Sequence, residues 1–371
     1  MVCANIMPAT ISPLATRILS MSKPTLAYQP IFELTRGKIV ESVHFGAYAV
    51  VDAHGTLLAS AGDPYLITFL RSSAKPFQAL PFIEQDGHQY FGFTPQEIAL
   101  MCASHSGTDE HVETVRAMQA KIDVGVQDLL CGMHDPIHQP TRDAMLLRGE
   151  MTSPYRHNCS GKHTGMLAHA RLRGAPIGNY LDLDHPVQQS ILHTFAEMCS
   201  VPAQQVEVGI DGCSAPNFAI PLYNAAWGFA RLCDPSDLES KRADACRVIT
   251  HAMMAHPEMV AGPERFDTLL MQVAAGKVIS KGGAEGYQAL GVMPGVLSPD
   301  APGIGIAIKI SDGDNTDRAR SSVALALLKT LGVLDERDLE RLAAFGPVRQ
   351  LYNYRKLHTG ESHPLLSASK V

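Results

Sequence analysis

The sequence predicts an α+β fold in which a mostly antiparallel sheet is flanked by helices and packs against a helical lobe. Strand-like segments occupy residues 28–70 and return at 277–310, whereas helical spacing dominates the chain between them. Strands from both ends of the chain are therefore expected to share one sheet. Of the 371 residues, 46% are apolar and 18% are charged, a composition that can form a large core.

Strands are expected where β-branched and aromatic residues alternate with polar ones or form short apolar runs. These segments are residues 28–35, 39–45, 47–52, 56–60, 65–70, 206–210, 277–281, 287–292 and 303–310. His54-Gly55 separates two of them and predicts a hairpin turn.

Helices are expected where apolar residues recur at intervals of three and four. These segments are residues 109–122, 185–199, 238–256, 263–275, 321–331 and 336–345. A further helix begins at Thr94-Pro95-Gln96-Glu97, which is a capping box with proline at the first helical position.

We expect a single catalytic unit over residues 25–371. Its sheet region covers 25–70 and 275–371, and its helical lobe covers about 71–274. Residues 1–24 make a poor signal peptide and are expected to be a disordered leader. The cleft between the lobe and the sheet is the expected site.

Composition argues against several kinds of partner. The net charge is −6, from 31 basic and 37 acidic residues, and no basic cluster indicates nucleic-acid binding. The sequence contains no run of 18 apolar residues, so no membrane-spanning helix is expected. The eight cysteines include no C-x-x-C pair, so they are expected to be reduced thiols of a cytoplasmic protein.

Ser72 and Lys75 form an S-x-x-K pattern in front of an apolar helical segment. This spacing places both side chains on one face of a helix, where a neutral lysine can take the serine proton. Burial or a neighbouring cation, such as Arg71 or a second lysine, must favour that neutral form. The same spacing occurs at Ser20–Lys23 and Ser367–Lys370, so the alternative is a capping serine with a solvated lysine.

A second possible couple is Ser104 with Lys281. Lys281 ends an expected strand and is followed by two glycines, which resembles the lysine-glycine strand of serine β-lactamases. Ser104 is expected at the end of a helix, where its hydroxyl could face the cleft. Each residue could instead have a purely structural role.

The segment His157–Gly165 is polar and rich in glycine. Its Gly161-Lys162 pair does not make a phosphate loop, because the pattern needs a glycine where Arg156 stands. Cys159 and Cys213 could bind a soft metal such as zinc, or they could be two buried thiols.

Taken together, these segments resemble the rhizobial-type L-asparaginases of the asparaginase II family. The matching stretches follow the family order from about residue 28 to the end of the chain. They are residues 71–76, 100–106, 131–134, 158–166, 211–213 and 256–262, and Lys281 with the glycine after it.

The resemblance implies a serine β-lactamase-like or penicillin-binding-protein-like fold and hydrolysis of L-asparagine to L-aspartate and ammonia. It implies two catalytic couples, Ser72 with Lys75 and Ser104 with Lys281. It also implies one zinc ion per chain that positions the substrate, and a homodimer. The implied zinc ligands are Cys159, Lys162 and Cys213, with a water completing the coordination.

Our hypothesis is that Ser72 attacks the side-chain amide and forms an acyl-enzyme. Arg71 and Asp211 are candidates for binding the substrate's carboxylate and ammonium groups, and His163 for orienting the substrate or the metal surroundings. One alternative is a penicillin-recognising acyl-serine hydrolase, although no S-x-N triplet stands where that superfamily has it. The other is a zinc or thiol sensor without enzymatic activity.

Overall fold

The computed structural model describes residues 27–366 and 369–370, so the leader expected at residues 1–24 lies outside the described residues. A nine-stranded antiparallel sheet forms from the two ends of the chain. Its strands are β1 (Gln29–Arg36), β2 (Ile39–Asp52), β3 (Leu57–Ala61), β7 (Val278–Gly283), β8 (Tyr287–Val292), β9 (Ile304–Ile310), β10 (Arg349–Tyr352), β11 (His358–Pro364) and β12 (Ser369–Lys370). The predicted α+β class with a mostly antiparallel sheet is confirmed.

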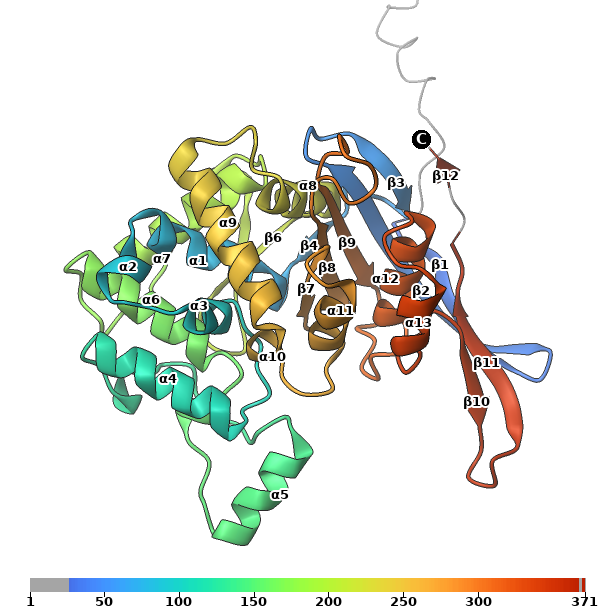
Figure 1. The fold of residues 1–371 in the computed structure, drawn as a ribbon, viewed down its shortest axis with the longest axis horizontal. Helices are drawn as coiled ribbons and strands as arrows, with labels where there is room; N and C mark the ends of the chain where they lie inside the picture. Colours follow the sequence, from blue (N-terminus) through green and yellow to red (C-terminus); the bar gives the residue numbers. More distant parts are fainter. Residues whose placement is uncertain (1–26, 367–368, 371) are drawn as a thin grey trace, which may run out of the picture.

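Strand β2 joins the two ends of the chain. Its first half pairs with β1, and residues 46–52 pair with residues 304–310 of β9. The order continues from β9 through β8 to β7, and from β1 through β11 to β10, while β3 pairs with β2 and β12 with β3. Strand β7 therefore lies at one end of the sheet, next to the helical lobe (Figure 1).

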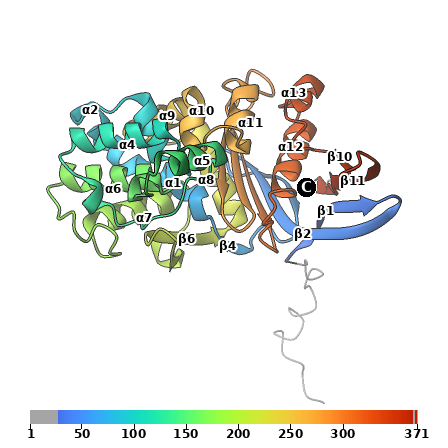
Figure 2. The same cartoon turned by 90° about the horizontal axis from the view of Figure 1, so that it is seen from below.

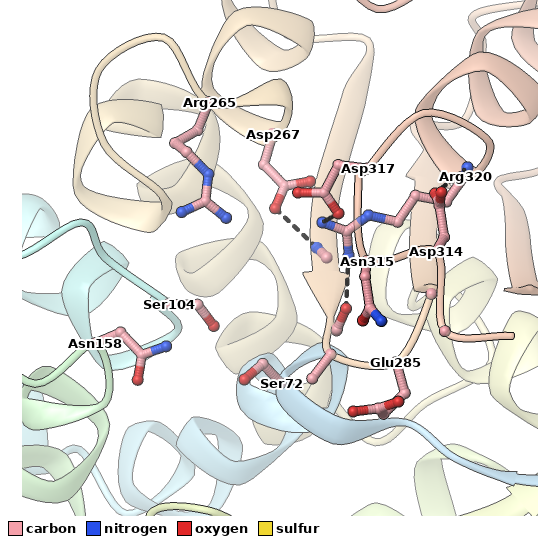
Figure 3. Close-up of a pocket in the computed structure, with 15 residues that line it drawn as sticks. Ser72, Ser104, Asn158, Arg265, Asp267, Glu285, Asp314, Asn315, Asp317 and Arg320 are labelled. Carbon is pink, nitrogen blue, oxygen red and sulfur yellow. Dashed lines mark hydrogen bonds and ion pairs between the residues drawn. The ribbon is translucent and has the colours of Figure 1, made fainter. Parts of the chain in front are cut away.

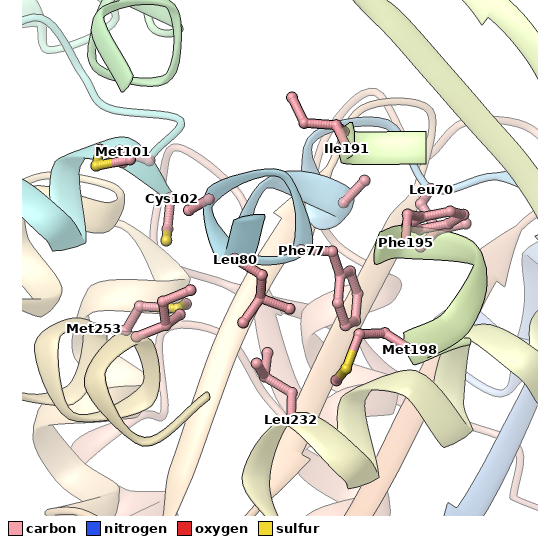
Figure 4. Close-up of a cluster of buried hydrophobic side chains, with 14 of the residues drawn as sticks. Leu70, Phe77, Leu80, Met101, Cys102, Ile191, Phe195, Met198, Leu232 and Met253 are labelled. Atoms are coloured by element: carbon pink, nitrogen blue, oxygen red, sulfur yellow. The ribbon is translucent and has the colours of Figure 1, made fainter. Parts of the chain in front are cut away.

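The lobe is built around α1, of which every residue except Glu84 is buried. The helices of the lobe are α1 (Lys75–Glu84), α2 (Gly87–Tyr90), α3 (Pro95–Met101), α4 (Asp109–Lys121), α5 (Gln139–Arg148), α6 (Ser160–Leu172), α7 (Pro186–Met198), α9 (Ser240–Ala255) and α10 (Pro257–Val260). Phe77 of α1 makes edge-to-face contacts with Phe195 and Phe229, with ring centroids 5.7 and 5.2 Å apart. Figure 4 shows this cluster around α1. A helix that is apolar on all sides is expected to be buried in this way.

Helices cover both faces of the sheet (Figures 1 and 2). Helix α8 (Leu222–Cys233) packs on the face toward the lobe, against β2, β8 and β9. On the other face, α11 (Phe266–Ala274), α12 (Arg320–Thr330) and α13 (Glu336–Arg341) enclose a second apolar cluster. None of the described helices has both the length and the apolar character needed to cross a bilayer.

The structure differs from the sequence-based expectations in several elements. The segment expected as a strand at 65–70 contributes β4 (Ile67–Phe69), which pairs with β6 (Pro216–Pro221) in a separate small sheet with β5 (Glu207–Ile210). An apolar run predicts burial but does not specify its partner strand. Strands β10 and β11 were missed because their residues are largely polar and half-exposed, so no alternating apolar pattern marks them.

Candidate active site

Two buried lysines converge on the hydroxyl of Ser104. Lys75 Nζ donates to Ser104 Oγ at 2.9 Å, and Lys281 Nζ donates to the same oxygen at 2.8 Å. Lys75 also donates to the carbonyl of Ala103 at 2.5 Å, and Lys281 to the carbonyl of Gly282 at 2.7 Å. The two lysines are 1% and 0% exposed. The structure thus brings three of the predicted catalytic residues into one hydrogen-bonded chain.

Three different elements supply these side chains. Lys75 is the first residue of α1, and Lys281 lies within β7. Ser104 follows the end of α3 by three residues, where its N–H donates to the carbonyl of Val260 at 2.9 Å. Side chains alternate along a strand, so Lys281 faces the lobe while Ser280 faces α11.

The pKa of Lys281 is lowered to about 7, mainly by burial and then by the charge of Lys75, while the carboxylate of Asp267 opposes both. Asp267 is held by three donors: Ser280 Oγ at 2.6 Å, Gly282 N at 2.8 Å and Gln288 Nε2 at 2.9 Å. A substantial fraction of Lys281 is therefore neutral at neutral pH. A neutral amine can accept the Ser104 proton.

Ser72 lies beside Ser104 in the wall of a polar cavity of about 310 Å³ (Figure 3). It belongs to a 3-10 turn, η2 (Arg71–Ala74), that precedes α1. Among the described residues, the hydrogen bonds of Lys75 to oxygen go to Ser104 and Ala103, and none goes to Ser72. The Ser72–Lys75 couple therefore stays a prediction. The serine to which both lysines donate hydrogen bonds is Ser104.

The turn η2 is fastened directly to β7. Ser73 Oγ donates to the carbonyl of Lys281 at 2.6 Å, so this second serine points away from the cavity and is fully buried. A Cβ atom at Gly283 would lie 2.6 Å from the carbonyl oxygen of Leu70, which makes glycine necessary for the close approach. Arg71 adopts φ +52°, an unfavourable conformation for a residue with a side chain.

Arg71 and Asp211 bind each other. Arg71 Nη2 lies 2.8 Å from Asp211 Oδ1, and Arg71 Nη1 lies 3.9 Å from Glu285. Burial raises the pKa of Asp211, but the charges of Lys162 and Arg71 outweigh burial and the net pKa is lowered. Their expected role in binding the charged groups of the substrate stays a prediction, because each already has a partner of opposite charge.

The three predicted zinc ligands lie together. Lys162 Nζ donates to Cys213 Sγ at 2.9 Å, and the Cys213 thiol is within hydrogen-bonding range of Cys159. The hydrogen bond from Cys213 is the main cause that holds the pKa of Cys159 well below its usual range. Burial opposes it, and nearby Lys75 and Lys162 assist.

The donor chemistry of this cluster fits zinc, which prefers sulfur and nitrogen ligands. Among the described residues, no group of three or more His, Cys, Asp or Glu side chains is arranged to hold a metal ion. The predicted set has only two such residues and takes its third donor from Lys162. Zinc binding therefore stays a proposal that depends on a deprotonated lysine.

His163 is buried and does not line the cavity that holds the two serines. Its Nδ1 is 2.7 Å from the hydroxyl of Tyr180, and its ring also contacts Cys213. Burial, reinforced by the charge of Lys162, lowers the pKa of His163 to about 4, so the ring is neutral at neutral pH. Its predicted role in orienting the substrate stays untested.

The cavity wall contains several polar residues that the sequence did not single out, among them Asn158, Arg265 and Asp267. Asp267 is the only charged residue within α11 itself, which is a signal that could have identified it. Asn158 lies in the polar segment before α6, and its N–H donates to His134 Nε2 at 3.0 Å. Nothing in the sequence pattern distinguished Arg265.

The described geometry can be set beside known proteins. The family model described as L-asparaginase II matches residues 32–364, which is most of the chain. This chain belongs to the L-asparaginase II family. It is accordingly an amidohydrolase with a small-molecule substrate.

More distant comparisons add little to the family assignment. No curated protein sequence matches this L-asparaginase II family member. Among solved structures, a probable glutaminase from Bacillus subtilis shares 14% identity over 78% of this chain and 84% of its own, with a TM-score of 0.34. A Bacillus glutaminase crystallised in 4.3 M NaCl shares 14% over 78% and 91%, also with a TM-score of 0.34. Similarity at this level does not indicate the activity of this chain.

We expect Gly283→Ala to impair this family member by pushing η2 away from β7. Overpacking at such a contact costs about 1–3 kcal/mol and should displace Ser72 from Ser104. The measurements are the thermal midpoint and the rate of ammonia release. The matched control is Gly178→Ala, where an added Cβ meets no atom within 4 Å. Equal behaviour of the two variants would show that the close approach is not required.

Proposed function

We propose that the chain is an L-asparaginase that hydrolyses L-asparagine to L-aspartate and ammonia through an acyl-enzyme on Ser72. The observation that carries the proposal is the Lys75–Ser104–Lys281 hydrogen-bonded chain directly behind the cavity wall that holds Ser72. Family membership supports an amide as the substrate. We propose asparagine rather than glutamine as the substrate because the matching family is described as L-asparaginase II.

In the first step, Ser72 Oγ attacks the side-chain amide carbon of asparagine. The hydroxyl proton passes into the lysine–serine chain, with neutral Lys281 as the final acceptor and Ser104 as the relay. The tetrahedral intermediate then collapses as the carbon–nitrogen bond breaks. The proton returns to the leaving nitrogen, and ammonia departs from an ester between Ser72 and the aspartyl group.

In the second step, water attacks this ester. The same neutral amine takes a proton from the water, and the carbon–oxygen bond to Ser72 breaks. The proton is returned to Ser72 Oγ as aspartate leaves. Both steps need an uncharged lysine, and burial of Lys281 supplies it.

Cys159, Lys162 and Cys213 are proposed to hold a zinc ion beside this chain. When bound, zinc would supply a positive charge that positions a polar group of the substrate. Lys75 lies between the two groups of residues, because it contacts both Ser104 and Cys159. A homodimer stays a prediction from the family resemblance, and a cytoplasmic location stays a prediction from the reduced cysteines.

We expect Ser72→Ala to lower ammonia release from asparagine by about 10⁴-fold or more, because the attacking group is lost. Peptide mass mapping of acid-quenched wild-type enzyme should place a β-aspartyl adduct on Ser72. Ser73→Ala is the neighbouring contrast, since it removes one hydrogen bond worth about 1 kcal/mol and keeps the nucleophile. An adduct on Ser104, or normal turnover by Ser72→Ala, would contradict the assignment and point to Ser104 as the nucleophile.

We expect kcat/KM to rise about tenfold per pH unit below pH 7 and to level off above it. The sign follows from Lys281: it must be neutral to accept a proton, and its pKa of about 7 leaves it charged and inactive at lower pH. Lys281→Arg should abolish activity, because arginine stays charged. Removing the opposing carboxylate by Asp267→Asn should move the inflection to lower pH. A profile that is flat from pH 5 to 8 would remove Lys281 from this role.

We expect about one zinc ion per chain in protein purified without chelator, measured by elemental mass spectrometry. Cys213→Ala should lose the metal, because it removes a thiolate ligand. Cys233→Ala removes another buried thiol, one that packs near Gly291 away from the cluster, and should retain the metal. Zinc that stays bound to Cys213→Ala, or wild-type protein that takes up none when zinc is added, would contradict the assignment.

A further inference from the structure

Arg265 points its charge into the cavity that holds the two serines. It immediately precedes α11 and is partly buried. Figure 3 shows its guanidinium directed into the cavity, toward the side where Ser104 and Asn158 lie. The charge of Arg265 also contributes to the low pKa of Lys281, which places it near the lysine–serine chain.

Among the described residues, no side chain or carbonyl accepts a hydrogen bond from the Arg265 guanidinium, and no carboxylate pairs with it. The other two arginines around the site are fully engaged. Arg71 pairs with Asp211, while Arg320 pairs with Asp317 at 2.6 Å and donates to the carbonyl of Gly283 at 2.6 Å. A guanidinium carries five donors, and a partly buried one without acceptors is suited to bind an anion.

Three of the acidic groups of the cavity wall already have partners, and the fourth, Glu285, is largely exposed and lies 3.9 Å from Arg71. Asp267 accepts three hydrogen bonds, and Asp317 pairs with Arg320. Asp314 accepts from the N–H groups at the start of α12. Arg265 is therefore the cation in this wall that the described residues leave without a partner, and an incoming anion would supply one.

The segment before α11 holds Arg265 in place. Thr268 Oγ1 donates to the carbonyls of Gly262 and Pro257 at 2.8 and 3.0 Å. Gly262 has φ +115°, and a Cβ there would lie 2.6 Å from Ser106 Oγ. A guanidinium on a fixed segment loses less freedom when it binds a ligand, which favours a specific contact.

We propose that Arg265 binds the α-carboxylate of the amino-acid substrate and so positions its side-chain amide at Ser72. This inference rests on the proposed function, because it names how that substrate is held. An arginine can meet a carboxylate through two parallel hydrogen bonds, which fixes orientation as well as position. Arg71, which the sequence suggested for this role, is the alternative that the test distinguishes.

The test compares two substrates that differ only in the group Arg265 is proposed to bind. L-Asparagine carries the α-carboxylate, and 3-aminopropanamide has hydrogen in its place. For Arg265→Ala we expect KM for asparagine to rise about 100-fold, as for loss of a charged hydrogen-bonded partner. Both substrates are measured at about pH 9, where Lys281 is neutral with or without the charge of Arg265. The kinetic constants for 3-aminopropanamide should then stay within about twofold of wild type, since that substrate has no group for Arg265. Arg265→Lys should recover part of the loss.

Two further variants serve as comparisons. Arg247→Ala removes one exposed positive charge on α9 and should leave both substrates unaffected. Arg71→Ala tests the alternative partner directly. If Arg71→Ala shows the carboxylate-dependent loss and Arg265→Ala does not, or if Arg265→Ala affects both substrates equally, the inference is overturned while the asparaginase assignment stands.

A binding measurement separates this inference from the proposed function. Calorimetry with L-aspartate and with β-alanine, which lacks the α-carboxylate, needs no turnover. We expect wild type to bind aspartate more tightly and Arg265→Ala to lose that preference. If the wild type hydrolyses neither amide, the proposed function fails. The binding comparison still decides whether Arg265 recognises the α-carboxylate, because it needs no turnover. Equal binding of the two ligands by wild type overturns it.

Discussion

Burial of two amines against one hydroxyl is the constraint on which this site depends. Two ammonium groups in a solvent-free space repel each other, and each loses the hydration that stabilises its charge. Both effects lower the pKa of Lys281, which is fully buried in β7. Asp267 limits the shift, so the pKa stays near neutrality. Packing thus produces an amine that can accept a proton near neutral pH, and Ser104, in the cavity wall, is hydrogen-bonded to both amines.

The contact between η2 and β7 determines how the residues of the site lie relative to one another. The alternation of side chains along β7 sends Lys281 toward the lobe and Ser280 toward Asp267 on α11. The backbone of the same strand accepts the Ser73 hydroxyl, and Gly283 allows η2 to lie close to it. One short strand therefore carries Lys281, donates hydrogen bonds to Asp267 and holds the turn that contains Ser72. Movement of η2 relative to β7 would disturb all three.

Most charges around the cavity are neutralised within the protein. The Arg71–Asp211 and Arg320–Asp317 pairs leave few groups to compete for a charged substrate, which makes any unpaired cation in the wall important for orientation. The thiol and amine cluster is continuous with the lysine–serine chain, because Lys75 contacts Ser104 on one side and Cys159 on the other. Two groups of residues that appeared as separate motifs along the chain form one connected polar region beneath the cavity.

Local chemistry could be read along the chain. The capping box at Thr94, the helices near 109–121 and 240–255, and the strands at both ends follow from residue type and spacing, which act over a few neighbours. The family resemblance placed Ser72, Lys75, Ser104 and Lys281 in one site and paired Ser104 with Lys281, but it did not predict the hydrogen bond from Lys75 to Ser104. Ser104 lies 29 residues from Lys75 and 177 from Lys281, and no local pattern encodes that both amines would bind its hydroxyl. Likewise, the pairing of Arg71 with Asp211, 140 residues apart, depends on packing between distant segments. So does the guanidinium of Arg265, which has no partner within residues 27–366, because burial and charge compensation are properties of the folded chain.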